Sequence, residues 1–125
     1  MSTAAGVVSL LVFEAADCLM AVPASEIAGT EKAAREGFSA SAFSVDLDEY
    51  FARPPCDGPW LRWRRGTRTA WLRVRRVIDV MPIALSALTP MPALLETQQR
   101  ARAFLAAGIR GDDVFLLLDP GRLTR

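Results

Sequence analysis

The side chains of this 125-residue sequence that could carry out chemistry are two cysteines and fourteen carboxylates, because the chain contains no histidine. Without histidine, the commonest general base, the Ser/His and Cys/His catalytic pairs and most zinc sites are excluded. Cys18 and Cys56 form no CxxC pair and match no metal-ligand spacing. We therefore expect Cys18 to be a semi-buried strand residue and Cys56 a loop residue, with neither a reactive thiol nor a disulfide.

Two of the carboxylates, Asp46 and Asp119, each follow an apolar run at the end of an expected strand. Such a pair could serve in acid–base catalysis, but aspartate is also a favoured helix N-cap, and helical turns are expected after Leu47 and Pro120. We favour capping. The eight glycines stand apart and form no phosphate-binding loop. The sequence therefore assigns no catalytic residue, no metal ligand and no cofactor, and predicts that the protein is not an enzyme.

Charge is distributed unevenly along the chain, although the formal net charge is only +1. Residues 1–59 contain nine acids and three bases, whereas residues 60–125 contain five acids and twelve bases. This asymmetry favours charged partner surfaces, or two halves of the chain that complement each other. Many of the bases alternate with tryptophans in an expected hairpin, whose basic and aromatic residues are Trp60, Arg62, Trp63, Arg64, Arg65, Arg68, Trp71, Arg73, Arg75 and Arg76.

This arginine- and tryptophan-rich hairpin has three interpretations. It could bind nucleic acid through phosphate contacts and base stacking, but the near-neutral net charge and the absence of a nucleic-acid-binding motif argue against this. The plainest interpretation is a solvated face on which arginine stems cover tryptophan. The third is a protein-partner patch, because both residue types are enriched at interface hot spots. Its candidate residues are Trp63, Arg64, Arg68, Trp71, Arg73 and Arg75.

The elements that must position these residues are short strands separated by turns. The expected strands are 7–13, 19–22, 43–47, 60–64, 68–75, 77–81 and 114–118. Helical turns are expected at 24–27, at 48–51 and near Leu85, and residues 98–105 could be helical. Residues 29–42 and 83–96 are expected to be loops, and the Pro-rich residues 54–59 are expected to be a linker. Pro82 is expected to end the strand 77–81. Many short strands with turns between them are typical of barrels or sandwiches.

The C-terminal end carries the clearest strand pattern. Arg110-Gly-Asp-Asp113 supplies turn residues, and the apolar run Val114–Leu118 suits a strand buried on both faces. Pro120 then ends it, because proline cannot donate to a strand ladder. We predict that this strand closes a β-barrel begun by the first strands of the chain, and the fold hypothesis depends on that closure.

Length and hydropathy limit the number of domains and the location. A chain of 125 residues, 51% of them hydrophobic, forms one domain or two small lobes that share a core. No apolar run approaches the roughly 20 residues of a membrane-spanning helix, and residues 1–13 lack the pattern of a secretory signal. We therefore expect a cytoplasmic protein without membrane insertion.

The order of segments resembles the CheW-like domain, the adaptor of bacterial chemosensory arrays, over nearly the whole chain. The motifs that carry the resemblance are aliphatic runs with one acid, each weak alone and stronger in the right order. They are Leu11-Val-Phe13 with Leu19–Pro23, Ser25-Glu-Ile27, Ser44-Val-Asp-Leu47 (similar to "VVDL"), Val74–Val80 (similar to "VDxVxxV") and Leu116–Leu123 (similar to "LLLDxxxL").

The resemblance implies a mainly β fold of two intertwined, SH3-like, five-stranded β-barrels with minor helix, formed by a single CheW-like domain over residues 1–125. The first barrel would comprise roughly residues 7–58 plus the C-terminal strand, and the second residues 59–110. The resemblance also implies an adaptor at receptor clusters, which joins the cytoplasmic tip of a methyl-accepting chemoreceptor to a CheA-type histidine kinase. By the same resemblance, three residues border the receptor groove, and the alternative is that they are core aliphatics: Ile27, Val77 and Val80.

The departures from the family pattern concern mainly the first barrel. The stretch that usually reads "GVxNLRG" is absent between Ile27 and Val45, so we expect a truncated first barrel. Gly29 stands where the family tends to carry a glutamate said to pair with the arginine of that stretch, so both partners are lost together. Trp71 replaces a preferred glycine, and Arg75 replaces the aspartate of "VD".

In the family, the first barrel docks to the kinase and the groove region between the barrels contacts the receptor. The sequence therefore predicts an accessory adaptor that binds receptors and binds the kinase weakly or not at all. Within the same fold, the alternative is a full receptor-to-kinase coupling scaffold, with the kinase or another CheW-like protein as partner. From a different class, the alternative is a small arginine- and tryptophan-rich nucleic-acid-binding β-barrel.

Overall fold

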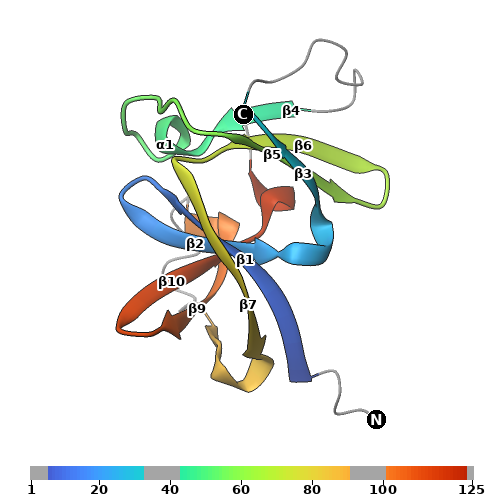
Figure 1. Cartoon of the computed structure of the whole chain (residues 1–125), viewed down its shortest axis with the longest axis vertical. Helices are drawn as coiled ribbons and strands as arrows, with labels where there is room; N and C mark the ends of the chain where they lie inside the picture. Colours follow the sequence, from blue (N-terminus) through green and yellow to red (C-terminus); the bar gives the residue numbers. More distant parts are fainter. Residues whose placement is uncertain (1–5, 33–42, 91–100, 124–125) are drawn as a thin grey trace.

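The computed structural model describes residues 6–32, 43–90 and 101–123, which form two β-sheets joined by short helical turns (Figure 1). In chain order the elements are β1 Val7–Ala15, β2 Cys18–Pro23, η2 Ala24–Glu26, β3 Ile27–Glu31, β4 Phe43–Asp46, α1 Leu47–Tyr50, β5 Trp60–Arg65, β6 Arg68–Arg73, β7 Arg76–Ala84, η3 Leu85–Ala87, β8 Thr89–Pro90, η5 Ala101–Ala103, β9 Phe104–Arg110, β10 Asp113–Leu118 and η6 Pro120–Arg122. Within these ranges no helix is long and apolar enough to span a bilayer.

The larger sheet contains six strands in the order β7-β1-β2-β10-β9-β8. Strand β1 pairs antiparallel with β2 and β7, and β10 runs parallel to β2, with Phe115 opposite Leu19. The C-terminal strand therefore joins the sheet that the first strands begin, as the sequence predicted. Burial on both faces of that strand is only partly confirmed, because Phe115 and Leu118 are buried whereas Val114 is 58% exposed.

Strand β1 lies between two apolar cores, which explains the uninterrupted apolar run Leu10–Phe13 within it. Leu10 and Val12 contribute to a core within the larger sheet, together with Ala21, Ile83 and Phe115. The alternate residues Leu11, Phe13 and Ala15 contribute to the inter-sheet core, which also contains residues of the smaller sheet. Successive strand residues point to opposite faces, so a strand with cores on both sides needs apolar residues at every position.

The smaller sheet contains four strands in the order β3-β5-β6-β4 and covers the other face of β1 and β2 (Figure 1). The hairpin of β5 and β6 turns at Gly66, whose φ of +60° is readily adopted by glycine. Leu61, Trp63 and Leu72 point into the inter-sheet core, while Arg62 and Arg64 alternate with them and are exposed. The mainly β, two-unit architecture with minor helix is therefore confirmed.

The strands are divided six and four between the sheets, and the expected boundary near residue 58 does not separate them. Strands β5 and β6 pair with β3 and β4, while β7 and β9 join the sheet of β1 and β2. The expected linker 54–59 packs within the smaller unit: Cys56 is buried, and a Cβ added to Gly58 would lie 1.9 Å from the carbonyl oxygen of Val74. The single CheW-like domain over residues 1–125 and the truncation of the first barrel stay predictions.

Three elements differ most from those expected, while several other strand ends shift by one or two residues. Ile27–Glu31 forms strand β3 rather than the start of a loop, because its backbone pairs with β5; residues 33–42 lie outside the described residues. Strand β7 continues through Pro82 to Ala84, since an edge strand tolerates the missing N–H.

The third difference concerns the possible helix over residues 98–105. Residues 98–100 lie outside the described residues, Ala101–Ala103 is a 3-10 turn, and Phe104 already begins strand β9. The ring of Phe104 stacks on that of Phe51 at 5.2 Å between centroids. This tertiary packing and the pairing with β10 override the helix propensity of the segment. The expected loop over residues 83–96 contains the 3-10 turn at Leu85–Ala87 and the short strand β8, and residues 91–96 lie outside the described residues.

Candidate functional site

Strand β7 carries exposed residues on the inter-sheet face, which is the face of the larger sheet that packs against the smaller sheet. Val80 is opposite Leu11 and Val77 is opposite Phe13 across the β1–β7 pairing. Paired residues of adjacent strands point to the same side of a sheet, so Val77 and Val80 lie on the face that Leu11 and Phe13 bury in the inter-sheet core. Because β7 is an edge strand, Val77 and Val80 remain 36% and 56% exposed.

Ile27 reaches the same core from the smaller sheet. It is the first residue of β3, lies opposite Trp63, and is half-buried against the inter-sheet core. Ile27 thus packs against the inter-sheet core, while Val77 and Val80 lie on the face of β7 that continues the core face of β1, and we call these three residues the inter-sheet border. The exposed fractions of Val77 and Val80 argue against the alternative that they are core residues, whereas Ile27 is partly in the core. Receptor contact itself stays a prediction.

The six residues of the predicted partner patch are not equally accessible. Trp63 is fully buried in the inter-sheet core and Trp71 is only 5% exposed, so neither presents a ring to a partner. Strand alternation explains Trp63, since it points inward between two outward arginines. Of the remaining four, Arg64, Arg68 and Arg75 are exposed and Arg73 is half-buried.

Most of these arginines are engaged within the molecule. The Arg73 guanidinium lies 5.3 Å from the centre of the Trp60 ring and donates to the Gly58 carbonyl at 3.1 Å. Arg65 and Arg68 lie 5.2 and 5.9 Å from the Trp63 ring centre. This is the expected arrangement in which arginine stems cover tryptophan.

The acidic and basic halves of the chain complement each other through ion pairs. Arg65 pairs with Glu26, Arg75 with Asp48, and Arg76 with Glu14. In each pair the acid comes from the first half and the arginine from the second. Charge counting in the sequence could predict this complementarity, but the individual partners depend on the register of strands far apart in sequence.

Asp46, Asp48 and Cys56 form the one group of potential metal ligands found within the described ranges, with ligand atoms within 4.8 Å of one another. Each carboxylate is already engaged. Asp48, fully buried, accepts from the Ala16 N–H at 2.8 Å and from Arg75, and Asp46 accepts from the backbone N–H groups of Glu49 and Cys56 at 3.2 and 3.1 Å. We therefore assign the group a structural role.

The capping roles expected for the two aspartates are confirmed. Asp46 is the N-cap of α1, and Asp119 accepts from the Gly121 N–H as the N-cap of η6. Burial raises the pKa of the Cys56 thiol above its ordinary value, assisted by the nearby carboxylates of Asp46 and Asp48. Cys56 is therefore a protonated, buried structural thiol at neutral pH, as expected for a residue without a reactive role.

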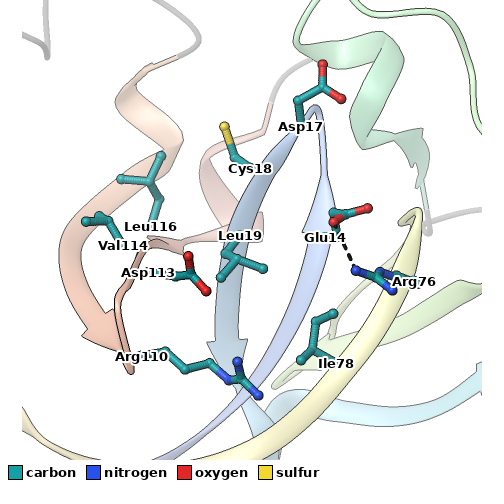
Figure 2. A pocket seen from close by; sticks show the side chains of 10 residues that line it. All are labelled: Glu14, Asp17, Cys18, Leu19, Arg76, Ile78, Arg110, Asp113, Val114 and Leu116. Atoms are coloured by element: carbon teal, nitrogen blue, oxygen red, sulfur yellow. Dashed lines mark hydrogen bonds and ion pairs between the residues drawn. The ribbon is translucent and has the colours of Figure 1, made fainter.

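A cleft of about 620 Å³ opens where the β1–β2 turn meets the β9–β10 hairpin (Figure 2). It is lined by Glu14, Asp17, Cys18, Leu19, Arg76, Ile78, Arg110, Asp113, Val114 and Leu116. Glu14 pairs with Arg76 at 3.4 Å across one side, and Arg110 pairs with Asp79 at 2.6 Å. Cys18 is exposed rather than semi-buried, because it begins β2 at the rim of this cleft.

The sequence analysis did not predict this cleft, since its lining comes from three separate stretches of the chain, residues 14–19, 76–78 and 110–116. Its Glu14 carboxylate is held in an ion pair, and histidine is absent from the chain, so Cys18 has no imidazole base. The lining of the cleft therefore contains no Cys/His pair.

Comparison with known proteins agrees with the fold. No family model matches the sequence, and no curated protein is significantly similar to it. The chain has the CheW-like fold of two packed β units. Among solved structures, it is similar to the crystal structure of the scaffolding protein TtCheW from Thermoanaerobacter tengcongensis, with a TM-score of 0.67 over 89% of this chain and 88% of that chain, at 16% sequence identity.

Proposed function

We propose that this protein is a non-enzymatic signalling adaptor of a bacterial chemosensory array, which binds the cytoplasmic tip of a methyl-accepting chemoreceptor through the inter-sheet border. It acts in the cytoplasm, at receptor clusters. The observation that carries the proposal is the exposure of Val77 and Val80 on the inter-sheet face of a CheW-like fold. The similar fold of the scaffolding protein TtCheW supports the proposal at the level of the fold alone.

The physical basis of this binding is apolar. An edge strand that carries two exposed valines beside a buried core presents an apolar surface. A helical partner can bury such a surface against its own apolar stripe. Ile27 adds a partly exposed apolar side chain that packs against the same core from the smaller sheet.

Binding to a CheA-type kinase is proposed to be weak or absent. The support is the missing "GVxNLRG" stretch between Ile27 and Val45, which in the family contributes to the barrel that docks to the kinase. The full coupling scaffold, with kinase or another CheW-like protein as partner, is the second candidate in this fold.

The structure of the β5–β6 hairpin argues against the alternative that the protein binds nucleic acid. Stacking on bases needs exposed rings, but Trp63 and Trp71 are buried. Phosphate contacts need available cations, but Arg65, Arg68, Arg73 and Arg75 already bind acceptors within the molecule.

The test is a binding assay with separately purified receptor tip and kinase. The wild-type chain is expected to bind the tip, and Val80→Trp is expected to weaken that binding about tenfold while leaving the circular dichroism spectrum unchanged. Val114→Trp is the matched control, because Val114 is a similarly exposed valine that lies outside the inter-sheet border, on the β9–β10 hairpin. Strong kinase binding without receptor binding would refute the proposal, and unfolding of Val80→Trp would favour a core role for Val80.

A further inference from the structure

Arg65 lies where three elements meet: strand β5, the turn η2 and the turn that follows β10. It is the last residue of β5 in the smaller sheet. Its Nε and Nη2 atoms donate to Glu26 at 2.9 and 3.1 Å, and Glu26 immediately precedes Ile27. Its Nη1 atom lies 2.9 Å from an oxygen of Asp119, the residue that directly follows β10 of the larger sheet. One guanidinium therefore joins both sheets and the turn between β2 and β3.

Two neighbouring contacts complete this cluster, which we call the Arg65 clamp. The buried Trp63 donates its indole N–H to Glu26 at 2.9 Å. Arg68 donates to the Gly121 carbonyl at 2.9 Å, so the C-terminal turn η6 is held against the β5–β6 hairpin. Glu26 thus accepts from two residues of β5, one at its end and one in the core.

The two carboxylates of the Arg65 clamp, Glu26 and Asp119, depend on Arg65 for compensation of their negative charge. The side chains of Glu26 and Asp119 are only 19% and 13% exposed, and both contact the guanidinium of Arg65, whose side chain is 40% exposed. Removing it would leave two largely buried carboxylates close together, one of them without a cationic partner among the contacts described here. Their mutual repulsion would push η2 away from the C-terminal turn.

We propose that Arg65 is a positioning residue, which sets the relative orientation of the two sheets and thereby the shape of the inter-sheet border. Apolar packing between the sheets is non-directional, whereas a bidentate guanidinium fixes direction as well as distance. Ile27 follows Glu26 in the chain, so displacement of Glu26 moves Ile27 relative to Val77 and Val80. Receptor binding is then expected to depend on Arg65, although the binding surface itself is apolar.

This inference rests on the proposed function, and its test distinguishes failure of the inference from failure of the proposed function. Arg65→Met is compared with Arg64→Met, because Arg64 is the adjacent, exposed arginine of the same strand. Hydrogen exchange is followed at residues 26–31 and 119–123 in the full chain, and affinity is measured for a purified receptor tip. Arg65→Met is expected to accelerate exchange in both segments and to weaken tip binding five- to tenfold, with Arg64→Met unchanged in both.

Further variants keep the test informative if Arg65→Met folds poorly. Arg65→Lys retains the charge without the bidentate geometry and is expected to restore only part of the affinity. Glu26→Gln keeps an acceptor for the Trp63 indole N–H but loses the charge, and is expected to weaken tip binding in the same direction. The double variant Glu26→Gln/Arg65→Met should then lose less than the two single losses combined.

Two outcomes would overturn the inference. One is equal exchange rates in Arg65→Met and Arg64→Met. The other is wild-type tip affinity in Arg65→Met despite accelerated exchange, which would make the clamp structural without a positioning role. If the wild-type chain does not bind the tip, the proposed function fails and the role in receptor binding fails with it, while the exchange data still decide whether Arg65 orients the sheets.

Discussion

Two polar clusters tie the smaller sheet to the larger one, and they differ in how much water reaches them. In the first, which we call the Asp48 tie, the fully buried Asp48 accepts from the Ala16 N–H in the β1–β2 turn and from Arg75. In the second, the Arg65 clamp, the side chains of Glu26 and Asp119 are 19% and 13% exposed, while the arginine side chains of the two clusters are similarly exposed, at 40% for Arg65 and 46% for Arg75. A fully buried carboxylate cannot lose its partners without a large cost, whereas a partly exposed carboxylate can exchange protein contacts for water.

This difference in burial suggests that the two clusters have different roles. The Asp48 tie holds a hairpin turn in which Ala16 and Asp17 both have positive φ values, 52° and 64°, a conformation that costs energy in residues other than glycine. The Arg65 clamp lies beside the inter-sheet border, where small changes in geometry matter for binding. We therefore expect the first cluster to govern stability and the second to govern the shape of the binding surface.

The largest expected effect is that of Asp48→Ala. It removes the acceptor of the Ala16 N–H and the partner of Arg75 from a fully buried site, so the free energy of unfolding should fall by about 3 kcal/mol. Urea denaturation measures this, with Asp17→Ala as control, because the Asp17 carboxylate is 65% exposed and pairs only with Arg53 among the contacts described here. A loss no greater than that of Asp17→Ala would show that the buried cluster does not govern stability.

A smaller effect is expected at the other cluster. Glu26→Gln removes one charge from the Arg65 clamp and should lower the free energy of unfolding by about 1 kcal/mol at low salt. Because the Glu26 carboxylate is partly exposed whereas Asp48 is fully buried, this loss should shrink in 1 M NaCl, whereas the loss in Asp48→Ala should not. The comparison would be contradicted by equal salt sensitivity of the two losses.

The smallest effect concerns Cys56, beside the Asp48 tie. Burial raises the pKa of its thiol in the folded protein, so the protonated form contributes stability below the pKa of the unfolded thiol. That contribution is lost as the pH rises through the folded pKa in the alkaline range. The wild-type chain should therefore lose more stability between pH 7 and pH 10 than Cys56→Ala does, while Cys18→Ala should behave like the wild type. Faster alkylation of Cys56 than of the exposed Cys18 at pH 8 would contradict this description.

The parts of the fold that depend on local pattern could be predicted from the sequence. The turn at Gly111, the closing strand after it and the caps at Asp46 and Asp119 follow from residue types over a few positions. Strand β3 was missed because its five residues, with Gly29 at the centre, carry no strong strand pattern and form a strand only by pairing with β5.

The candidate site was predictable only in part. Val77 and Val80 were identified by resemblance, but their exposure follows from the edge position of β7, which no sequence pattern states. Trp63 was assigned to a partner patch although it is buried, because the inward face of β5 can be chosen only once the inter-sheet core is known. The Arg65 clamp joins residues 26, 65 and 119, and such long-range contacts depend on the packing of both sheets.

The central claim is that the inter-sheet border binds a chemoreceptor tip, and methyl NMR of the full chain during titration with a purified tip tests it most directly. We expect the methyl resonances of Ile27, Val77 and Val80 to change their chemical shifts together and to reach a plateau at saturating tip concentration. The chemical shifts of Val114 and Ile109 on the β9–β10 hairpin are expected to stay unchanged. Shifts confined to that hairpin, or none at saturating tip concentration, would contradict it.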